Sequence, residues 1–95
     1  MALTKAPTGL LYELHYVLAF VAVVEEGGFT NASDRLHVAQ PSISRKIKRL
    51  EQLLGAELFV RRPHSYVQLT PAGIRFLKEC RRILKEIDRS IDSIR

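Results

Sequence analysis

The sequence contains no tryptophan and only one cysteine, Cys80, in 95 residues. A single cysteine cannot form a disulfide within the chain, and such low cysteine usage fits the reducing cytoplasm. His15, His37 and His64 share no metal-ligand spacing with one another or with Cys80. The sequence therefore predicts no metal site.

The signals of a membrane protein and of an enzyme are also missing. The most apolar run, residues 10–24, is interrupted by Glu13 and His15, whereas a bilayer-spanning helix needs about 20 consecutive apolar residues. The glycine pair at residues 27–28 lacks the rest of a phosphate-binding motif. No serine has a base placed beside it by the sequence, so a hydrolase triad is not supported. We expect a cytoplasmic, non-enzymatic protein without a cofactor, in which residues 10–24 belong to a core helix.

Positive charge is unevenly placed in this chain, which carries a net charge of +5. Residues 1–41 hold two basic and four acidic side chains, a net charge of −2. Residues 42–70 hold six basic and two acidic side chains, a net of +4, and residues 71–95 hold seven and four, a net of +3. This distribution indicates an anionic partner, such as nucleic acid or an acidic protein surface.

Apolar spacing and helix-capping residues predict the order of elements. The expected elements are a helix from about Tyr12 to Glu26, a short helix from Asn31 to Leu36 with Thr30 as N-cap, a turn over 37–39, a helix from Gln40 ended by Gly55, strand-like runs over 57–62 and 66–70, and a helix from Pro71 with Thr70 as N-cap. A short helix, a tight turn and a basic helix form a helix-turn-helix, and the hairpin behind it is a wing. We therefore expect a mainly α fold. A flexible extension over 1–11 precedes a winged helix-turn-helix with a two-stranded wing over 12–70, and a long helix over 71–95 follows.

The helix over residues 40–53 has the features of a DNA-reading helix. With Ala39 as N-cap, Pro41 occupies the second helical position, where no intrahelical donor is lost. The first turn should offer free backbone N–H groups and the positive end of the helix dipole. The side chains expected to face base edges are Gln40, Ser42, Ser44 and Arg45. Those expected to meet phosphates are Lys46, Lys48 and Arg49.

A basic helix face is often merely solvated, so composition alone leaves both interpretations open. The helix-turn-helix order and two arginines in the wing, Arg61 and Arg62, favour DNA contact. The alternative is a protein-interaction module in which the basic helix and a coiled-coil seam bind an acidic protein partner.

Three motifs together, "QPSISRKIKRLEQLLG", "LFVR" and "LTPAG", resemble the N-terminal DNA-binding domain of LysR-type transcriptional regulators. The resemblance covers residue 12 to about residue 95. It implies sequence-specific binding of double-stranded DNA by a dimeric bacterial transcription regulator. The residues that it places in the major groove are Gln40, Pro41, Ser42, Ser44 and Arg45. It also implies that Thr30 and Asn31 lie near a phosphate, and that Arg61, Arg62 and His64 approach the adjacent minor groove. The family's effector-sensing domain has no counterpart in these 95 residues, so we expect a piece of a longer, effector-binding protein.

Two departures from the family pattern concern its DNA contacts. Ala39 stands where the family usually has serine or threonine, which removes a side-chain N-cap at a cost of about 1 kcal/mol. The wing is one residue longer than usual, and its tip has His64 and Ser65 where arginine is frequent. This second departure concerns the side chains that would reach the minor groove.

The last helix carries a heptad seam. Its members, spaced 3, 4, 3, 4 and 3 residues apart, are Leu77, Cys80, Leu84, Ile87, Ile91 and Ile94. Ile74, Phe76 and Ile83 flank the seam and are expected to pack on the winged domain. The rival interpretation is a single amphipathic helix that covers its own core. However, a 25-residue helix is about 37 Å long, more than so small a domain can cover. We expect a homodimer through this linker helix, and the full-length protein could form a tetramer.

Overall fold

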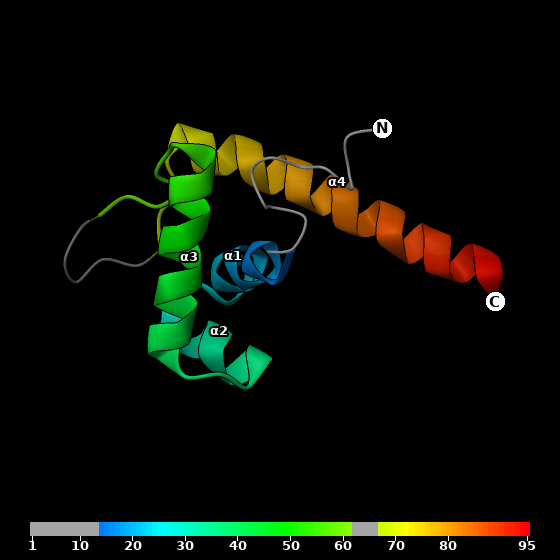
Figure 1. Ribbon diagram of the computed structural model, residues 1–95, viewed down its shortest axis with the longest axis horizontal. Helices are drawn as coiled ribbons and strands as arrows, with labels where there is room; N and C mark the ends of the chain where they lie inside the picture. The colour runs from blue at the N-terminus through cyan, green and yellow to red at the C-terminus, as the bar shows by residue number, and fades with distance from the viewer. Residues whose placement is uncertain (1–13, 62–66) are drawn as a thin grey trace.

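The computed structural model describes residues 14–61 and 67–95 (Figure 1). These residues form four α-helices: α1 (Leu14–Glu26), α2 (Phe29–Leu36), α3 (Gln40–Leu54) and α4 (Pro71–Ile94). None of the helices in this part of the chain is long and apolar enough to cross a membrane. The predictions for the N-terminal extension, and for Arg62 and His64, lie outside the described residues.

The core is built around α1, which packs against each of the other three helices. Phe20 is fully buried, and its ring centroid lies 5.4 Å from that of Phe59 and 5.5 Å from that of Phe76. One aromatic side chain therefore joins α1 to the segment after α3 and to α4. α3 contributes Ile43, Ile47 and Leu50 to this core, all fully buried.

The second helix begins earlier than predicted. α2 starts at Phe29 and is preceded by Gly28, so Thr30 is the second residue of the helix and not its N-cap. Phe29 belongs to the first turn of α2, and there its ring centroid lies 5.7 Å from that of Phe59 in an edge-on contact. The prediction that Thr30 caps the helix is wrong. Thr30 is exposed, and its hydroxyl is free to bond to a group outside the first turn of α2.

The turn into α3 and both ends of α3 agree with the prediction. His37 adopts a left-handed conformation with φ 58°, and the N–H of Val38 donates to the Ser33 carbonyl at 3.0 Å. Ala39 is the N-cap of α3 and accepts no side-chain capping bond. Gly55 ends the helix with φ 68°, a conformation that glycine adopts without steric cost.

The predicted two-stranded wing is not seen as strands within residues 14–61 and 67–95. Those residues contain one isolated antiparallel bridge, between Phe59 and Leu69. Two backbone hydrogen bonds flank it, from Val60 N–H to the Gln68 carbonyl at 2.8 Å and from Thr70 N–H to the Leu58 carbonyl at 3.0 Å. The Leu58 N–H, which could extend this pairing toward Thr70, donates instead to the side chain of Glu51.

The start of α4 is fixed by Thr70 and Gly73. The Thr70 hydroxyl oxygen accepts from the Gly73 N–H at 3.0 Å, which confirms Thr70 as the N-cap. A Cβ added at Gly73 would lie 2.2 Å from the Leu58 carbonyl oxygen. Only glycine therefore permits this approach of α4 to the segment that follows α3.

The distal half of α4 extends away from the body of the domain (Figure 1). Leu77 and Cys80 are buried in the core, and Leu84 packs partly against it. Ile74 and Ile83 are 60% and 46% exposed, so the prediction that they pack on the domain is wrong. At 100° per residue they lie about a quarter turn away from the face that carries Leu77 and Cys80.

Candidate nucleic-acid interface

The outer face of α3 presents most of the residues predicted to face DNA bases. Gln40, Pro41, Ser44 and Arg45 are exposed, and Ser42 is half-buried. They lie at the end of α3 next to α2, opposite the end at which α4 starts (Figure 1). This tip is an exposed group of side chains with short or forked hydrogen-bonding ends.

The backbone at this tip is less available than predicted. The N–H groups of Ser42 and Ile43 both donate to the Ala39 carbonyl, at 2.9 and 3.3 Å. The expectation of free donors in the first turn is therefore wrong for these two groups. No acidic residue lies in this turn to oppose an anion. Recognition at the tip depends on side chains and on the helix dipole.

The bases of α3 differ from most arginines elsewhere in the domain. Within residues 14–61 and 67–95, no ion pair involves Arg45, Lys46, Lys48 or Arg49. By contrast, the arginines that pair with glutamates are Arg35, Arg61, Arg81, Arg82 and Arg89. Three of the four α3 bases are exposed, and Lys46 is half-buried. Four basic side chains without an ion pair in the described residues therefore lie on α3, three of them exposed on its outer face.

Thr30 and Asn31, predicted near a phosphate, both have partners in the protein. The Thr30 hydroxyl donates to Gln40 Oε1 at 3.2 Å and so links α2 to the tip of α3. The Asn31 side-chain amide donates to the Glu26 carbonyl at 3.4 Å and joins the start of α2 to the end of α1. Both residues are exposed.

Arg61 forms an ion pair with Glu51, a residue whose role the sequence analysis missed. The Glu51 side chain is only 8% exposed, and it accepts hydrogen bonds from the backbone N–H groups of Leu58, at 2.7 Å, and Phe59, at 3.4 Å. A sequence signal existed, because Glu51 follows Ile43 and Ile47 at intervals of four residues on the buried face of α3. An acidic side chain at an apolar position needs buried partners.

A hollow of about 780 Å³ lies between α3 and the segment that follows it. Its lining includes Gln40, Ser44 and Lys48 on one side and Arg61 on another, with Glu51 at the C-terminal end of α3. Predicted base-facing, phosphate-facing and wing residues therefore share one surface depression.

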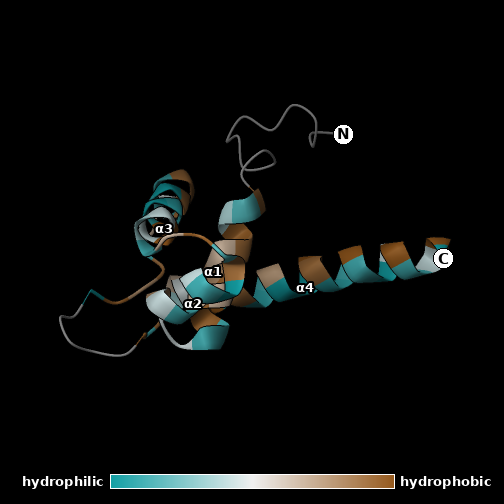
Figure 2. Ribbon diagram, turned by 90° about the horizontal axis from the view of Figure 1, so that it is seen from below, coloured by the Kyte–Doolittle hydropathy of each residue, from teal (hydrophilic) through white to brown (hydrophobic). Residues whose placement is uncertain are grey.

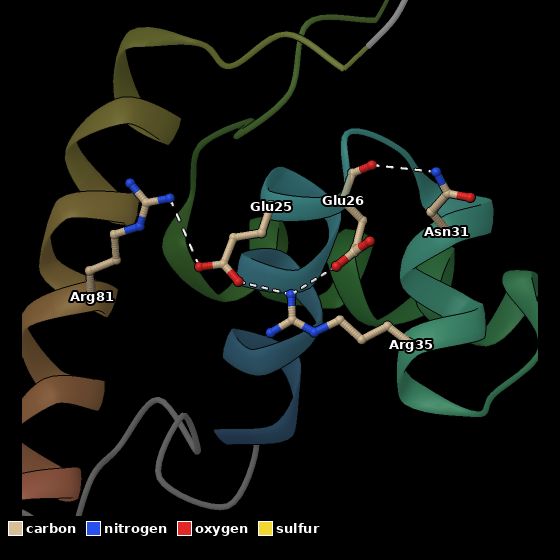
Figure 3. A network of polar contacts seen from close by, with 5 residues as sticks. All are labelled: Glu25, Glu26, Asn31, Arg35 and Arg81. Carbon is tan, nitrogen blue, oxygen red and sulfur yellow. Dashed lines mark hydrogen bonds and ion pairs between the residues drawn. The ribbon is translucent and has the colours of Figure 1, made fainter.

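A second polar network holds three helices together away from this face. Figure 3 shows Arg35 of α2 between two glutamates of α1, at 2.8 Å from Glu25 and 3.3 Å from Glu26. Arg81 of α4 approaches the second carboxylate oxygen of Glu25 at 4.0 Å. The acidic residues at the end of α1 thus pair with their own domain, which reduces their repulsion of an anionic ligand.

Cys80 is a core residue. Burial, assisted by the nearby charge of Glu79, raises the pKa of the Cys80 thiol to about 12. The thiol therefore stays protonated at neutral pH, and the thiolate needed for redox or nucleophilic chemistry is not formed.

Comparison with known proteins gives the same assignment as the fold. A sequence model described as "Bacterial regulatory helix-turn-helix protein, lysR family" matches residues 14–74. The HTH-type transcriptional regulator TfdT of Cupriavidus pinatubonensis is 44% identical over 78 residues, covering 82% of this chain and 34% of TfdT. ClcR of Pseudomonas putida is 49% identical over 72 residues, 76% of this chain and 24% of ClcR. The chain thus spans about a third or less of these relatives.

Solved structures share the winged helix-turn-helix fold. In a crystalline complex of BenM_DBD with catB site 1 DNA, the protein is 40% identical and superposes with a TM-score of 0.79, over 85% of this chain and 89% of that one. For a complex of CbnR_DBD with DNA the identity is 43% and the TM-score 0.76, over 83% and 90% of the two chains. The chain belongs to the lysR family of bacterial regulatory helix-turn-helix proteins.

Proposed function

We propose that this chain binds double-stranded DNA sequence-specifically, as the DNA-binding domain of a dimeric bacterial transcription regulator. The observation that carries the proposal is the outer face of α3, where four basic side chains have no ion-pair partner in the described part of the chain. Unpaired cations on one helix face can replace the counterions of a phosphate backbone. The related BenM and CbnR domains, of the same fold, have been crystallised as DNA complexes.

In this proposal α3 enters the major groove with its N-terminal end toward the bases. The residues that read base edges are Gln40, Pro41, Ser42, Ser44 and Arg45. Arg45 suits guanine, since its forked donors match the O6 and N7 acceptors. Lys46, Lys48 and Arg49 lie farther along the helix and meet phosphates, and Thr30 and Asn31 at the start of α2 lie near one.

The wing is proposed as a two-stranded hairpin that extends from the Phe59–Leu69 bridge. Its residues Arg61, Arg62 and His64 would lie toward the adjacent minor groove. The exposed guanidinium of Arg61 already has a carboxylate partner, and this pairing motivates the separate inference below.

The domain organisation is proposed as a winged helix-turn-helix over residues 12–70 and a linker helix over 71–95, after an extension over 1–11. The linker helix pairs with that of a second subunit through its distal apolar face. Figure 2 shows apolar residues recurring along α4 to its end, beyond the body of the domain. Ile87, Ile91 and Ile94 are exposed there, whereas Leu77 and Cys80 are covered by their own chain. Only the distal part of the predicted seam therefore has surface to offer a partner.

The longer protein is proposed as a cytoplasmic regulator with a small-molecule effector domain and an oligomeric state of two or four subunits. The relatives support a longer protein, because this chain covers only about a third or less of their length. The effector would act through residues that this chain does not contain.

Salt titration against duplex DNA tests the proposal. A binding sequence is first selected from a random duplex pool, and affinity for it is compared with affinity for a scrambled duplex. If about six phosphates are neutralised, the slope of log K against log salt concentration should be near −5. A flat salt response, or equal affinity for both duplexes, would contradict sequence-specific DNA binding and would favour an acidic protein partner.

A further inference from the structure

Glu51 connects the DNA-reading helix to the segment that leads into the wing. It lies in the last turn of α3, and its carboxylate receives three donors from the four residues Leu58 to Arg61. Oε2 accepts from the N–H groups of Leu58 and Phe59, and Oε1 accepts from the Arg61 guanidinium. A carboxylate that is only 8% exposed keeps its charge at low cost when it has this many donors.

The same segment is held on its other side by the returning chain. Val60 N–H donates to the Gln68 carbonyl, and the Leu58 carbonyl accepts from Thr70 N–H. Successive backbone groups of residues 58–60 thus bond alternately to Glu51 and to residues 68–70. Glu51 therefore holds residues 58–61 against the last turn of α3 and fixes the direction of this segment.

We propose that Glu51 is a positioning residue for DNA recognition and that Arg61, as its counterion, acts through Glu51 and not on a phosphate. The inference rests on the proposed DNA-binding function and deepens it. The Arg61 side chain is 52% exposed, yet its charge is matched by Glu51, whereas the charges of Lys48 and Arg49 have no such partner in the described residues. Only one guanidinium nitrogen of Arg61 reaches Glu51, so the other N–H groups could still approach DNA. Because the guanidinium charge is already balanced by Glu51, such a contact would neutralise little phosphate charge.

Salt dependence separates the two roles of Arg61. A residue that contacts a phosphate contributes about 0.9 to the slope of log K against log salt concentration, and a positioning residue contributes nothing. On a duplex that ends at the recognised bases, beyond the reach of the wing, Arg61→Ala should leave the slope unchanged, while Lys48→Ala should reduce it by about 0.9. The loss of affinity of Arg61→Ala, about tenfold, should appear only on a duplex long enough for the wing to contact. Arg82→Ala is the matched control, because Arg82 is also an exposed arginine paired with a glutamate, Glu79, but lies on α4. It should change neither quantity.

The change in affinity with duplex length is a second measurement, which a general loss of protein stability would not alter. The selected site is offered in a duplex that ends at the recognised bases and in one that extends by about half a helical turn, roughly five base pairs, on each side. Wild type should bind the longer duplex more tightly because the wing reaches the flanking DNA. Arg61→Ala and Glu51→Gln should lose this gain and bind the shorter duplex as wild type does, and Arg61→Lys should recover part of it.

A double-mutant cycle completes the experiment. If the two residues act as a unit, Glu51→Gln combined with Arg61→Ala should be no weaker than either single variant. A slope that falls by about 0.9 in Arg61→Ala on the shorter duplex, additive effects, or an unchanged gain from the longer duplex would each overturn the proposal. If Glu51→Gln fails to fold by circular dichroism, the Arg61 variants decide alone. Failure of the wild type to bind any duplex would instead refute the proposed function.

Discussion

The Thr30 hydroxyl donates a hydrogen bond to Gln40 Oε1 at 3.2 Å, which joins the first turn of α2 to the first residue of α3. A glutamine whose amide oxygen is held in this way directs its two N–H donors outward. These two donors suit a base that presents only acceptors in the major groove, such as guanine with its O6 and N7 atoms. A glutamine free to rotate can instead pair with the donor and acceptor of adenine, N6 and N7.

We therefore predict that Thr30→Val alters the base preference at the position read by Gln40. Loss of the hydroxyl releases the amide, and preference there should shift toward adenine by about 1 kcal/mol, or about fivefold. Competition binding with duplexes substituted at each position measures the shift. Thr30→Ser retains the hydroxyl and should leave the profile as in wild type. An identical profile for Thr30→Val would show that the bond does not orient Gln40 in the complex.

Arg45 and Lys48 should respond differently to removal, because one is expected to read a base and the other a phosphate. Arg45→Ala should cost about 1–3 kcal/mol on the selected site and relax preference at one base position. Lys48→Ala should weaken all sequences about equally. The measurement is the affinity of each variant for the selected and scrambled duplexes. An Arg45→Ala variant with full specificity would contradict its base-reading role.

Much of the fold follows from local sequence signals. Pro41 near the start of α3, Gly55 at its end and Thr70 before α4 each act within one helical turn, so their positions can be inferred without tertiary information. The predicted Thr30 cap is wrong for the opposite reason. The helix starts two residues earlier, where Phe29 packs against a phenylalanine 30 residues further along the chain, Phe59.

The exposed basic residues of the candidate site could be predicted from the sequence, but the ion pair between two of its residues could not. The exposure of Arg45 and Lys48 follows from helical periodicity, since Ile43, Ile47 and Leu50 define the buried face. The pairing of Glu51 with Arg61 depends on how residues 56–61 return toward α3, which periodicity does not specify. Likewise, the heptad pattern of α4 does not reveal that Leu77 and Cys80 face the body of their own domain.

Gly73→Ala should destabilise the domain, because the new methyl group would lie 2.2 Å from the Leu58 carbonyl oxygen. A backbone carbonyl cannot move aside as the end of a flexible side chain can. We therefore expect the free energy of unfolding to fall by about 1–3 kcal/mol. Urea denaturation followed by circular dichroism measures it. Gly28→Ala is the matched control, since Gly28 has extended dihedral angles and no atom within 4 Å of an added Cβ. Its effect should stay within about 0.5 kcal/mol, and an equally small effect at Gly73 would contradict the close approach.

The distal part of α4 should hold the dimer together. Ile87, Ile91 and Ile94 continue the helix face that carries Leu77 and Cys80, but they lie beyond the body of the domain and are 39%, 45% and 86% exposed. Each gains about 25 cal/mol for every Å² of apolar surface that a partner covers. Because association also has an entropic cost, so short a seam should give a modest dimer that dissociates on dilution.

Ile91→Glu tests this seam without touching the core. A carboxylate buried between two helices has no partner there, so the variant should sediment as a monomer at micromolar concentrations where wild type is a dimer. Ser90→Glu is the control, because Ser90 is exposed on α4 outside the seam, and it should leave the dimer intact. Circular dichroism checks that both variants keep the helicity of wild type. A wild-type chain that stays monomeric at high concentration, or an Ile91→Glu variant that remains a dimer, would show that subunits do not pair through this face.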